Sequence, residues 1–299
     1  MGTCDRDVAE RAVQEKKPEG LWQLAVRRFM QHRLGVWASI VLLLIVAIVV
    51  TGPLWFISRD QAFRPDVTAI NSRPSTTHPF GTDELGRDIL ARIIYGGRIS
   101  LLVGLLAMLV AISAGTLLGA LSGYFGGMVD NIIMRITDVM LSIPGIFLII
   151  ALTVFLGSSM QTIILAIGFL NWMAVARVVR AEFLSLKEQD FVLAARCVGV
   201  RDRRIMMQHI LPNAMPAVIV AATLTVGAAI LTETAVSYLG LGIQPPTPSW
   251  GNMLKNAQDL IWTAPWAAVF PGAMIFITTL CLNFMGDAFR DALDPKTQL

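Results

Sequence analysis

Residues 34–57 read LGVWASIVLLLIVAIVVTGPLWFI, an apolar run without a charged side chain that is bounded by Arg33 and Arg59. A helix rises about 1.5 Å per residue, so about 20 apolar residues cross the hydrocarbon layer of a membrane. The run is long enough to span, and it is longer than the apolar core of a signal peptide. It therefore predicts a first transmembrane helix that is retained as an anchor.

The rest of the chain repeats this pattern. Hydrophobic residues make up 55% of the 299 residues, charged residues only 15%, and the mean hydropathy is +0.64. A soluble domain carries about 25% charged residues. The predicted fold is an all-α integral membrane protein with six transmembrane helices, of which the later five lie at about 99–124, 132–156, 160–179, 214–239 and 265–285.

The distribution of basic residues predicts the orientation. With both termini inside, 17 of the 24 Lys and Arg residues lie in cytoplasmic segments, as the positive-inside rule requires. Residues 1–33 and 289–299 are then cytoplasmic tails, and residues 58–97 form an extracytoplasmic loop. The net charge of +3 is small, so no nucleic-acid partner is expected. The topology explains the basic residues, and membrane lipid is an expected partner.

The chain carries no recognisable set of catalytic or metal-binding residues. Its cysteines, Cys4, Cys197 and Cys281, are far apart and without metal-type spacing. No H-E-x-x-H or G-x-S-x-G motif occurs. We therefore expect no enzyme activity, no metal and no cofactor in this chain, with a membrane enzyme of unfamiliar motif as the alternative.

One segment imitates a nucleotide-binding loop. Gly81 and Gly86 in GTDELGRD have the spacing of a P-loop, but Arg87 and Asp88 stand where Lys and Ser or Thr are needed. The carboxylates within the segment would also repel phosphate. If ATP drives this protein, another polypeptide must bind it.

The connection over residues 182–212 is too long for a simple turn and predicts two short helices. Gly199 fits the position after the first helix, where a positive φ is needed. Asp202 is a candidate N-cap for the second helix, which Pro212 is expected to end. Small residues at Ala194 and Ala195 leave room for another surface, and three arginines surround the bend: Arg201, Arg203 and Arg204. The segment is either a docking site for a partner protein or an interfacial loop whose arginines reach lipid headgroups.

Small and charged residues inside the spans are further candidates. Gly115, Gly119 and Gly123 recur every four residues, which favours close helix packing, within the chain rather than across a dimer seam. Glu233 lies toward the outer end of the fifth span, where a charge must face protein or water. It either lines a pathway or makes a structural hydrogen bond.

The third span carries a predicted kink and a predicted ion pair, and the outer surface carries predicted aromatic anchors. Pro144 and Gly145 predict a kink. Arg135 and Asp138, three residues apart, can pair on one helix face. The tryptophans suit an outer aromatic belt: Trp250, Trp262 and Trp266.

The stretch AARCVGVRDRRIMMQHILPN, residues 194–213, resembles the coupling loop of ABC importer permeases. The family motif is Glu-Ala-Ala, three residues, Gly, nine residues, Ile, one residue and Leu-Pro. The chain departs from it at Leu193 and His209, which replace Glu and Ile, and matches it at Ala194, Ala195, Gly199, Leu211 and Pro212.

Three further stretches are similar to dipeptide and oligopeptide permeases, in particular to the second of the two permeases in peptide and nickel importers. They are HPFGTDELGRDILARIIYGGRISL (78–101), ETAVSYLGLGIQPPTPSWG (233–251) and MGDAFRDALDPK (285–296). The resemblance implies a type I permease core over residues 98–288.

The resemblance also implies the partners and the role. They are a second homologous permease, two ATP-binding subunits that dock on the 182–212 loop, and an extracytoplasmic substrate-binding protein, all at a bacterial or archaeal cell membrane. The implied cargo is a dipeptide or oligopeptide, with nickel or another small solute as the alternative. Two other classes stay open: an ion-coupled secondary transporter that uses Glu233, and a membrane scaffold that transports nothing.

Overall fold

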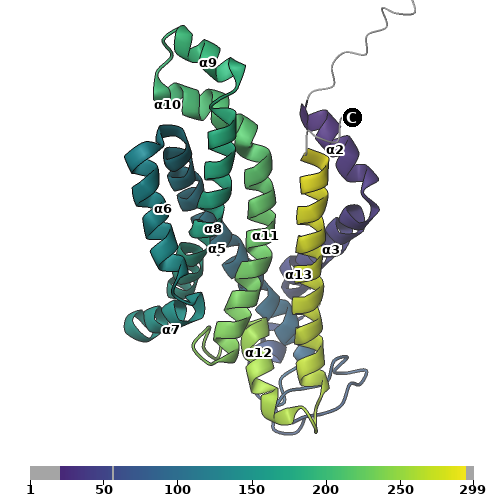
Figure 1. Ribbon diagram of the computed structural model, residues 1–299. Helices are drawn as coiled ribbons and strands as arrows, with labels where there is room; N and C mark the ends of the chain where they lie inside the picture. Colours follow the sequence, from purple (N-terminus) through teal and green to yellow (C-terminus); the bar gives the residue numbers. More distant parts are fainter. Residues whose placement is uncertain (1–20, 56, 294–299) are drawn as a thin grey trace, which may run out of the picture.

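The computed structural model describes residues 21–55 and 57–293. In these residues the regular structure is helical, apart from one isolated bridge between Thr82 and Asp88. The longer helices shown in Figure 1 are α2 (Leu21–Gln31), α3 (Arg33–Trp55), α5 (Ile89–Phe125), α6 (Gly127–Leu141), α7 (Gly145–Leu156), α8 (Met160–Leu186), α11 (Leu211–Tyr238) and α13 (Trp266–Leu293). The shorter elements are α4 (Arg59–Phe63), α9 (Asp190–Cys197), α10 (Asp202–Arg204), the π-helix η1 (Ile205–Ile210), α12 (Trp250–Asn256) and the 3-10 helix η2 (Gln258–Leu260).

Five of the described helices are long and apolar enough to span a membrane, and α6 and α7 make a sixth candidate as a bent pair. The two helices of this pair meet at 84°. The predicted third span, 132–156, is therefore not one straight helix. Pro144 begins the new direction because it lacks an N–H and excludes the preceding residue from helical geometry. The expected kink is a full break.

Several helices run past their predicted ends. Helix α5 begins at Ile89 because the Asp88 side chain caps it, accepting a hydrogen bond from the Ala91 N–H at 2.8 Å. The predicted outer loop, 58–97, is therefore helical from Ile89 onward. Helix α13 likewise continues beyond the predicted end at residue 285, into the segment predicted as a tail.

Pro212 does not end the second helix of the 182–212 loop. The π-helix η1 leads directly into α11, and the whole run from Asp202 to Tyr238 forms one candidate span. The wider π turn explains this correction, since Pro212 then stands in the first turn of α11, where its missing N–H and its ring are tolerated. The loop is thus joined to α11 without a break.

The glycine stripe of α5 packs against α8. A Cβ atom on Gly115 would lie 2.6 Å from the Val175 Cβ, and one on Gly119 would lie 2.5 Å from the Ala176 carbonyl oxygen. On Gly123 it would lie 2.6 Å from the Phe183 Cβ. These separations are shorter than van der Waals contact, so only glycine lets the two backbones come this close.

A second tie joins α5 to α3. Pro53 lies inside α3 and has no N–H to donate to the Val49 carbonyl four residues earlier. The Arg98 side chain supplies the missing donor: its Nε binds the Val49 oxygen at 2.9 Å, and another guanidinium nitrogen binds the Val50 oxygen. The arginine thus satisfies a carbonyl that the proline orphans.

The long loop before α5 is held by its own polar groups. Asp83 accepts the N–H groups of Leu85 and Arg87 at 2.9 Å and pairs with the Arg87 Nε at 2.8 Å. Arg92 also reaches Asp83, at 3.4 Å. The segment with P-loop spacing is therefore a turn in which Asp83 accepts backbone N–H groups and pairs with Arg87 and Arg92.

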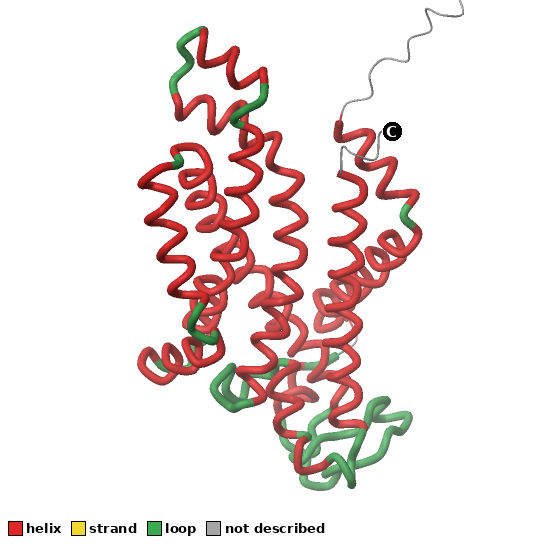
Figure 2. Tube along the Cα trace, viewed as in Figure 1, coloured by secondary structure: helices red, strands yellow, loops and turns green. Residues whose placement is uncertain are grey.

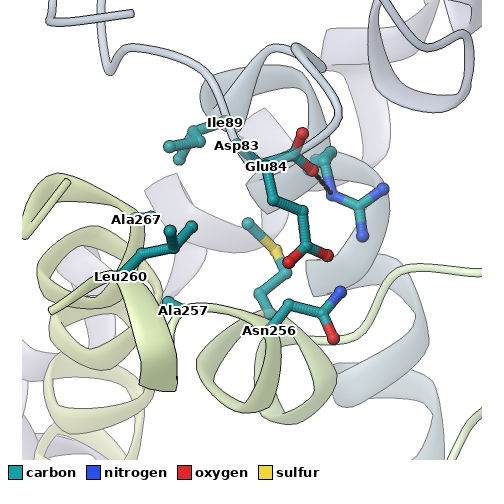
Figure 3. Close-up of a pocket in the computed structure, with 9 residues that line it drawn as sticks. Asp83, Glu84, Ile89, Asn256, Ala257, Leu260 and Ala267 are labelled. Carbon is teal, nitrogen blue, oxygen red and sulfur yellow. Dashed lines mark ion pairs between the residues drawn. The ribbon is translucent and has the colours of Figure 1, made fainter. Parts of the chain in front are cut away.

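Figure 3 shows a pocket where this turn meets α12 and η2, with the Glu84 carboxylate directed toward Asn256. Burial and the neighbouring Asp83 charge raise the pKa of Glu84. Trp250, expected in an aromatic belt, is instead fully buried nearby and donates from Nε1 to the Ile93 carbonyl at 3.0 Å. Trp262 remains 93% exposed.

The helix ends and loops gather at two opposite ends of the molecule. Helices α9 and α10 lie at the same end as α2 and the C-terminal end of α13, whereas α12 and the loop before α5 lie at the opposite end (Figures 1 and 2). Phe29 of α2 stacks on Phe289 of α13 with ring centroids 4.6 Å apart. Cys4 and the rest of residues 1–20, as well as residues 294–299, lie outside the described part.

Candidate functional site

The 182–212 hairpin projects beyond the ends of the long helices (Figure 1). The end of α8 leads into α9, a bend follows, and α10 with η1 returns to α11. The return arm is therefore helical without a break into α11, whereas a turn at 187–189 joins α8 to α9.

Gly199 shapes the bend. Its φ is +79°, its N–H donates to the Arg196 carbonyl at 2.9 Å, and the Val200 N–H donates to the Ala195 carbonyl at 3.1 Å. This pair of bonds is a Schellman motif, with Gly199 in the left-handed position after the helix. A Cβ there would meet no atom within 4 Å, so the requirement for glycine comes from the backbone alone.

The inner side of the hairpin is apolar and fully packed. Val192, Ile205 and Ile210 have no exposed surface, and they join one cluster with Phe183 of α8 and Tyr124 of α5. Burying each such aliphatic side chain stabilises by about 1.5–3 kcal/mol. The hairpin is therefore a fixed part of the fold.

The outer side combines apolar and basic groups. Val198 is 84% exposed and Met207 57% exposed, and Phe191 and Leu193 are also exposed. The predicted coupling residues fall around this surface. Exposed are Ala194, Gly199, Arg201, Arg203, Arg204 and Pro212, and partly buried are Ala195, His209 and Leu211. Apolar side chains beside a cluster of arginines form a surface suited to a protein partner.

Asp202 does not cap the second helix as predicted. Its carboxylate accepts a hydrogen bond from the Tyr124 hydroxyl at 2.5 Å, and Arg201 takes the N-cap position without a side-chain bond. The partner lies 78 residues away in the sequence. Tyr124 was therefore missed, because a tyrosine at the end of an apolar run carries no signal of its own.

Ion pairs fasten α6 to α8 near the hairpin. The Arg180 guanidinium binds both oxygens of Asp130, with the Nε–Oδ1 distance at 2.5 Å. Arg177 binds Asp138 at 2.7 Å. The predicted pairing of Asp138 with Arg135 is wrong, since the ion pair runs between helices.

Glu233 is fully buried inside the chain. It accepts hydrogen bonds from the Ser237 hydroxyl at 2.6 Å and from the Ser100 hydroxyl at 3.3 Å. The Ser100 oxygen in turn accepts the Trp250 N–H at 3.1 Å. The carboxylate therefore joins α5, α11 and α12, which is the arrangement expected of a structural hydrogen bond.

Comparison with known proteins places the chain in a family. Residues 115–299 match the family described as the inner membrane component of binding-protein-dependent transport systems. Residues 20–74 match the N-terminal transmembrane domain of oligopeptide transport permease C.

Three similar proteins cover nearly the whole chain. A dipeptide transport system permease of Alkalihalophilus pseudofirmus is 42% identical over 92% of this chain and 90% of its own length. An oligopeptide transport permease of Haemophilus influenzae is 41% identical over 97% and 93%. A glutathione transport permease of Pectobacterium atrosepticum is 40% identical over 95% and 94%.

A solved structure shares the fold. A chain of the MetNI methionine ABC transporter, in an inward-facing conformation, superposes with a TM-score of 0.53 at 19% identity, over 69% of this chain and 96% of that one. The all-helical type I permease fold expected from the resemblance is confirmed. On these matches, the chain belongs to the family of inner-membrane permease components of binding-protein-dependent ABC transport systems.

Proposed function

We propose that this chain is one of two permease subunits of an ATP-driven importer of dipeptides or oligopeptides. The names of its relatives support the cargo class, because dipeptides, oligopeptides and glutathione all carry peptide bonds and free termini. Nickel or another small solute is the alternative cargo within the same architecture.

The chain works with partners in this proposal. A second, homologous permease completes the pathway, a binding protein delivers cargo from outside, and two ATP-binding subunits dock on the 182–212 hairpins of the two permeases. The observation that carries the docking role is the hairpin itself, with a packed inner side and an outer side of exposed apolar and basic residues.

The hairpin, the termini and most basic residues then face the cytoplasm. The placement of α2, α9 and the end of α13 at one end of the molecule supports this orientation (Figure 1). An ion-coupled mechanism at Glu233 is disfavoured, because a carboxylate with no exposed surface and two serine donors offers an ion no route.

A substitution pair at Gly199 tests the docking role. Gly199→Val places a β-branched residue at φ +79°, which costs about 1–3 kcal/mol and unfolds the bend. Gly199→Asn is the matched control, because asparagine tolerates the left-handed region. Neither side chain meets a neighbour at its Cβ, so the pair differs in backbone preference.

We expect the valine variant to insert in the membrane normally but to lose association with the ATP-binding subunits and at least about tenfold of the ATP-driven uptake. The asparagine variant should keep most of both. Normal association and uptake in the valine variant would contradict the docking role.

A further inference from the structure

Tyr124 joins the hairpin to a helix with which the hairpin has no chain continuity. The hairpin is covalently continuous with α8 and α11, whereas α5 is followed by α6. In the described residues, the polar contacts between hairpin and α5 are made by Tyr124. Its hydroxyl donates to Asp202 at 2.5 Å, and Arg196 lies over its ring, 5.4 Å from the centroid.

The two contacts hold both arms of the hairpin. Arg196 belongs to α9 and Asp202 to α10, on either side of the Gly199 bend. Tyr124 itself is only 6% exposed and packs in the same cluster as Val192 and Ile205. A hydrogen bond to a carboxylate is stronger than one between neutral groups, so this link is directional and stiff where the surrounding apolar contacts are not.

The chain turns sharply just beyond this point. Gly126 and Gly127 follow, with φ values of +63° and +52°, and a Cβ on Gly127 would meet no atom within 4 Å. Helix α5 therefore ends at Phe125, one residue after the tyrosine that is fixed to the hairpin, and Gly126 separates it from α6, which begins at Gly127. Displacement of the hairpin would pass into α5 ahead of this joint.

Toward its N-terminal end, helix α5 is also joined to α11 and α12. Ser100 binds Glu233 of α11 and the backbone of Trp250 in α12. Tyr124 lies 24 residues later, which is about 36 Å along a helix. One continuous helix thus runs from the hairpin to the opposite face of the molecule.

We infer that Tyr124 is a positioning residue for transport: its hydroxyl, held by Asp202, carries displacement of the hairpin into α5 and so to the Ser100–Glu233–Trp250 junction. This inference rests on the proposed docking of an ATP-binding subunit on the hairpin. The hairpin would then act on three helices: α8 and α11, to which the chain connects it, and α5, to which Tyr124 binds it.

The test is a double-mutant cycle in the assembled transporter. Tyr124→Phe removes the hydroxyl and keeps the ring, Asp202→Ala removes the acceptor, and Asp202→Asn keeps an acceptor oxygen. Association of the ATP-binding subunit, the rate of ATP hydrolysis and cargo taken up per ATP hydrolysed are measured separately. The cargo is whichever of labelled dialanine, tetraalanine or glutathione the wild-type complex takes up with ATP.

We expect association and hydrolysis to persist in Tyr124→Phe while uptake per ATP falls about fivefold. Asp202→Ala should match it, the double variant should be no worse than either single one, and Asp202→Asn should recover part of the loss. Gln208→Ala is the control, since it breaks a hydrogen bond of 2.7 Å to Arg204 that stays within the hairpin, and it should leave uptake per ATP unchanged.

Wild-type uptake per ATP in Tyr124→Phe, or additive losses in the double variant, would overturn the inference and leave the docking proposal intact. Failure of the wild-type chain to associate with any ATP-binding subunit would overturn the docking proposal itself. The two failures are therefore distinguishable.

Discussion

Arg98 shows how one side chain makes a proline acceptable inside a span. Replacing it by leucine removes the donors to Val49 and Val50 and leaves the carbonyl opposite Pro53 without a partner. An unsatisfied buried carbonyl costs about 1–3 kcal/mol. We expect Arg98→Leu to lower the thermal unfolding temperature of the chain in detergent.

A second substitution separates this cause from simple loss of a charge. In a Pro53→Ala background the alanine N–H can bind the Val49 carbonyl, so Arg98→Leu should destabilise clearly less than in the wild-type background. An equal loss of unfolding temperature in both backgrounds would show that the orphaned carbonyl is not the reason for the arginine.

Glu233 and Asp202 show what the sequence can and cannot predict about single residues. A carboxylate in an apolar run is conspicuous, so Glu233 could be singled out. Its partner Ser100 lies 133 residues away, and nothing local to either residue reports that contact. For the same reason Asp202, a plausible N-cap by position, could not be assigned to Tyr124.

At the scale of elements, the contact between α5 and α8 depends on having no side chain at three positions. Gly119→Ala would place a Cβ 2.5 Å from the Ala176 carbonyl oxygen and 2.9 Å from the Val179 Cβ, so the backbones must separate. Overpacking of this kind costs about 1–3 kcal/mol. We expect a corresponding fall in thermal stability.

Gly272→Ala in α13 is the matched control, because its Cβ would meet Leu254 at an ordinary 3.8 Å. Alanine favours a helix over glycine by up to about 1 kcal/mol, so this variant should be neutral or slightly more stable. A stability loss equal to that of Gly119→Ala would show that the close contact between α5 and α8 is not the reason for glycine at position 119.

The elements themselves were largely predictable, and the exceptions share a cause. Length and hydropathy located five of the spans, because a membrane leaves a helix few alternatives. The predictions made from two prolines were wrong in opposite directions. Pro144 breaks a span that was expected only to kink, and Pro212 does not end the helix that it was expected to end. Whether a proline interrupts a helix depends on the neighbouring turn, and the π-helix before Pro212 has no simple sequence signature.

At the scale of the whole molecule, the orientation of the chain can be read from one native cysteine. Cys197 is exposed in the hairpin and Cys281 is buried in α13. In a Cys4→Ser variant, a membrane-impermeant thiol reagent should label inside-out vesicles and spare right-side-out ones. Labelling from the outer side only would reverse the proposed topology, and protection of Cys197 by added ATP-binding subunits would locate their docking surface.

The central claim is that the energy for transport comes from another polypeptide through the 182–212 hairpin. The direct measurement is uptake of labelled dialanine, tetraalanine or glutathione into vesicles that contain this chain alone, or this chain with its second permease, binding protein and ATP-binding subunits. We predict ATP-dependent uptake only in the complete set, and its loss with Gly199→Val. Uptake by the chain alone, driven by an ion gradient and without any ATP-binding subunit, would contradict the account.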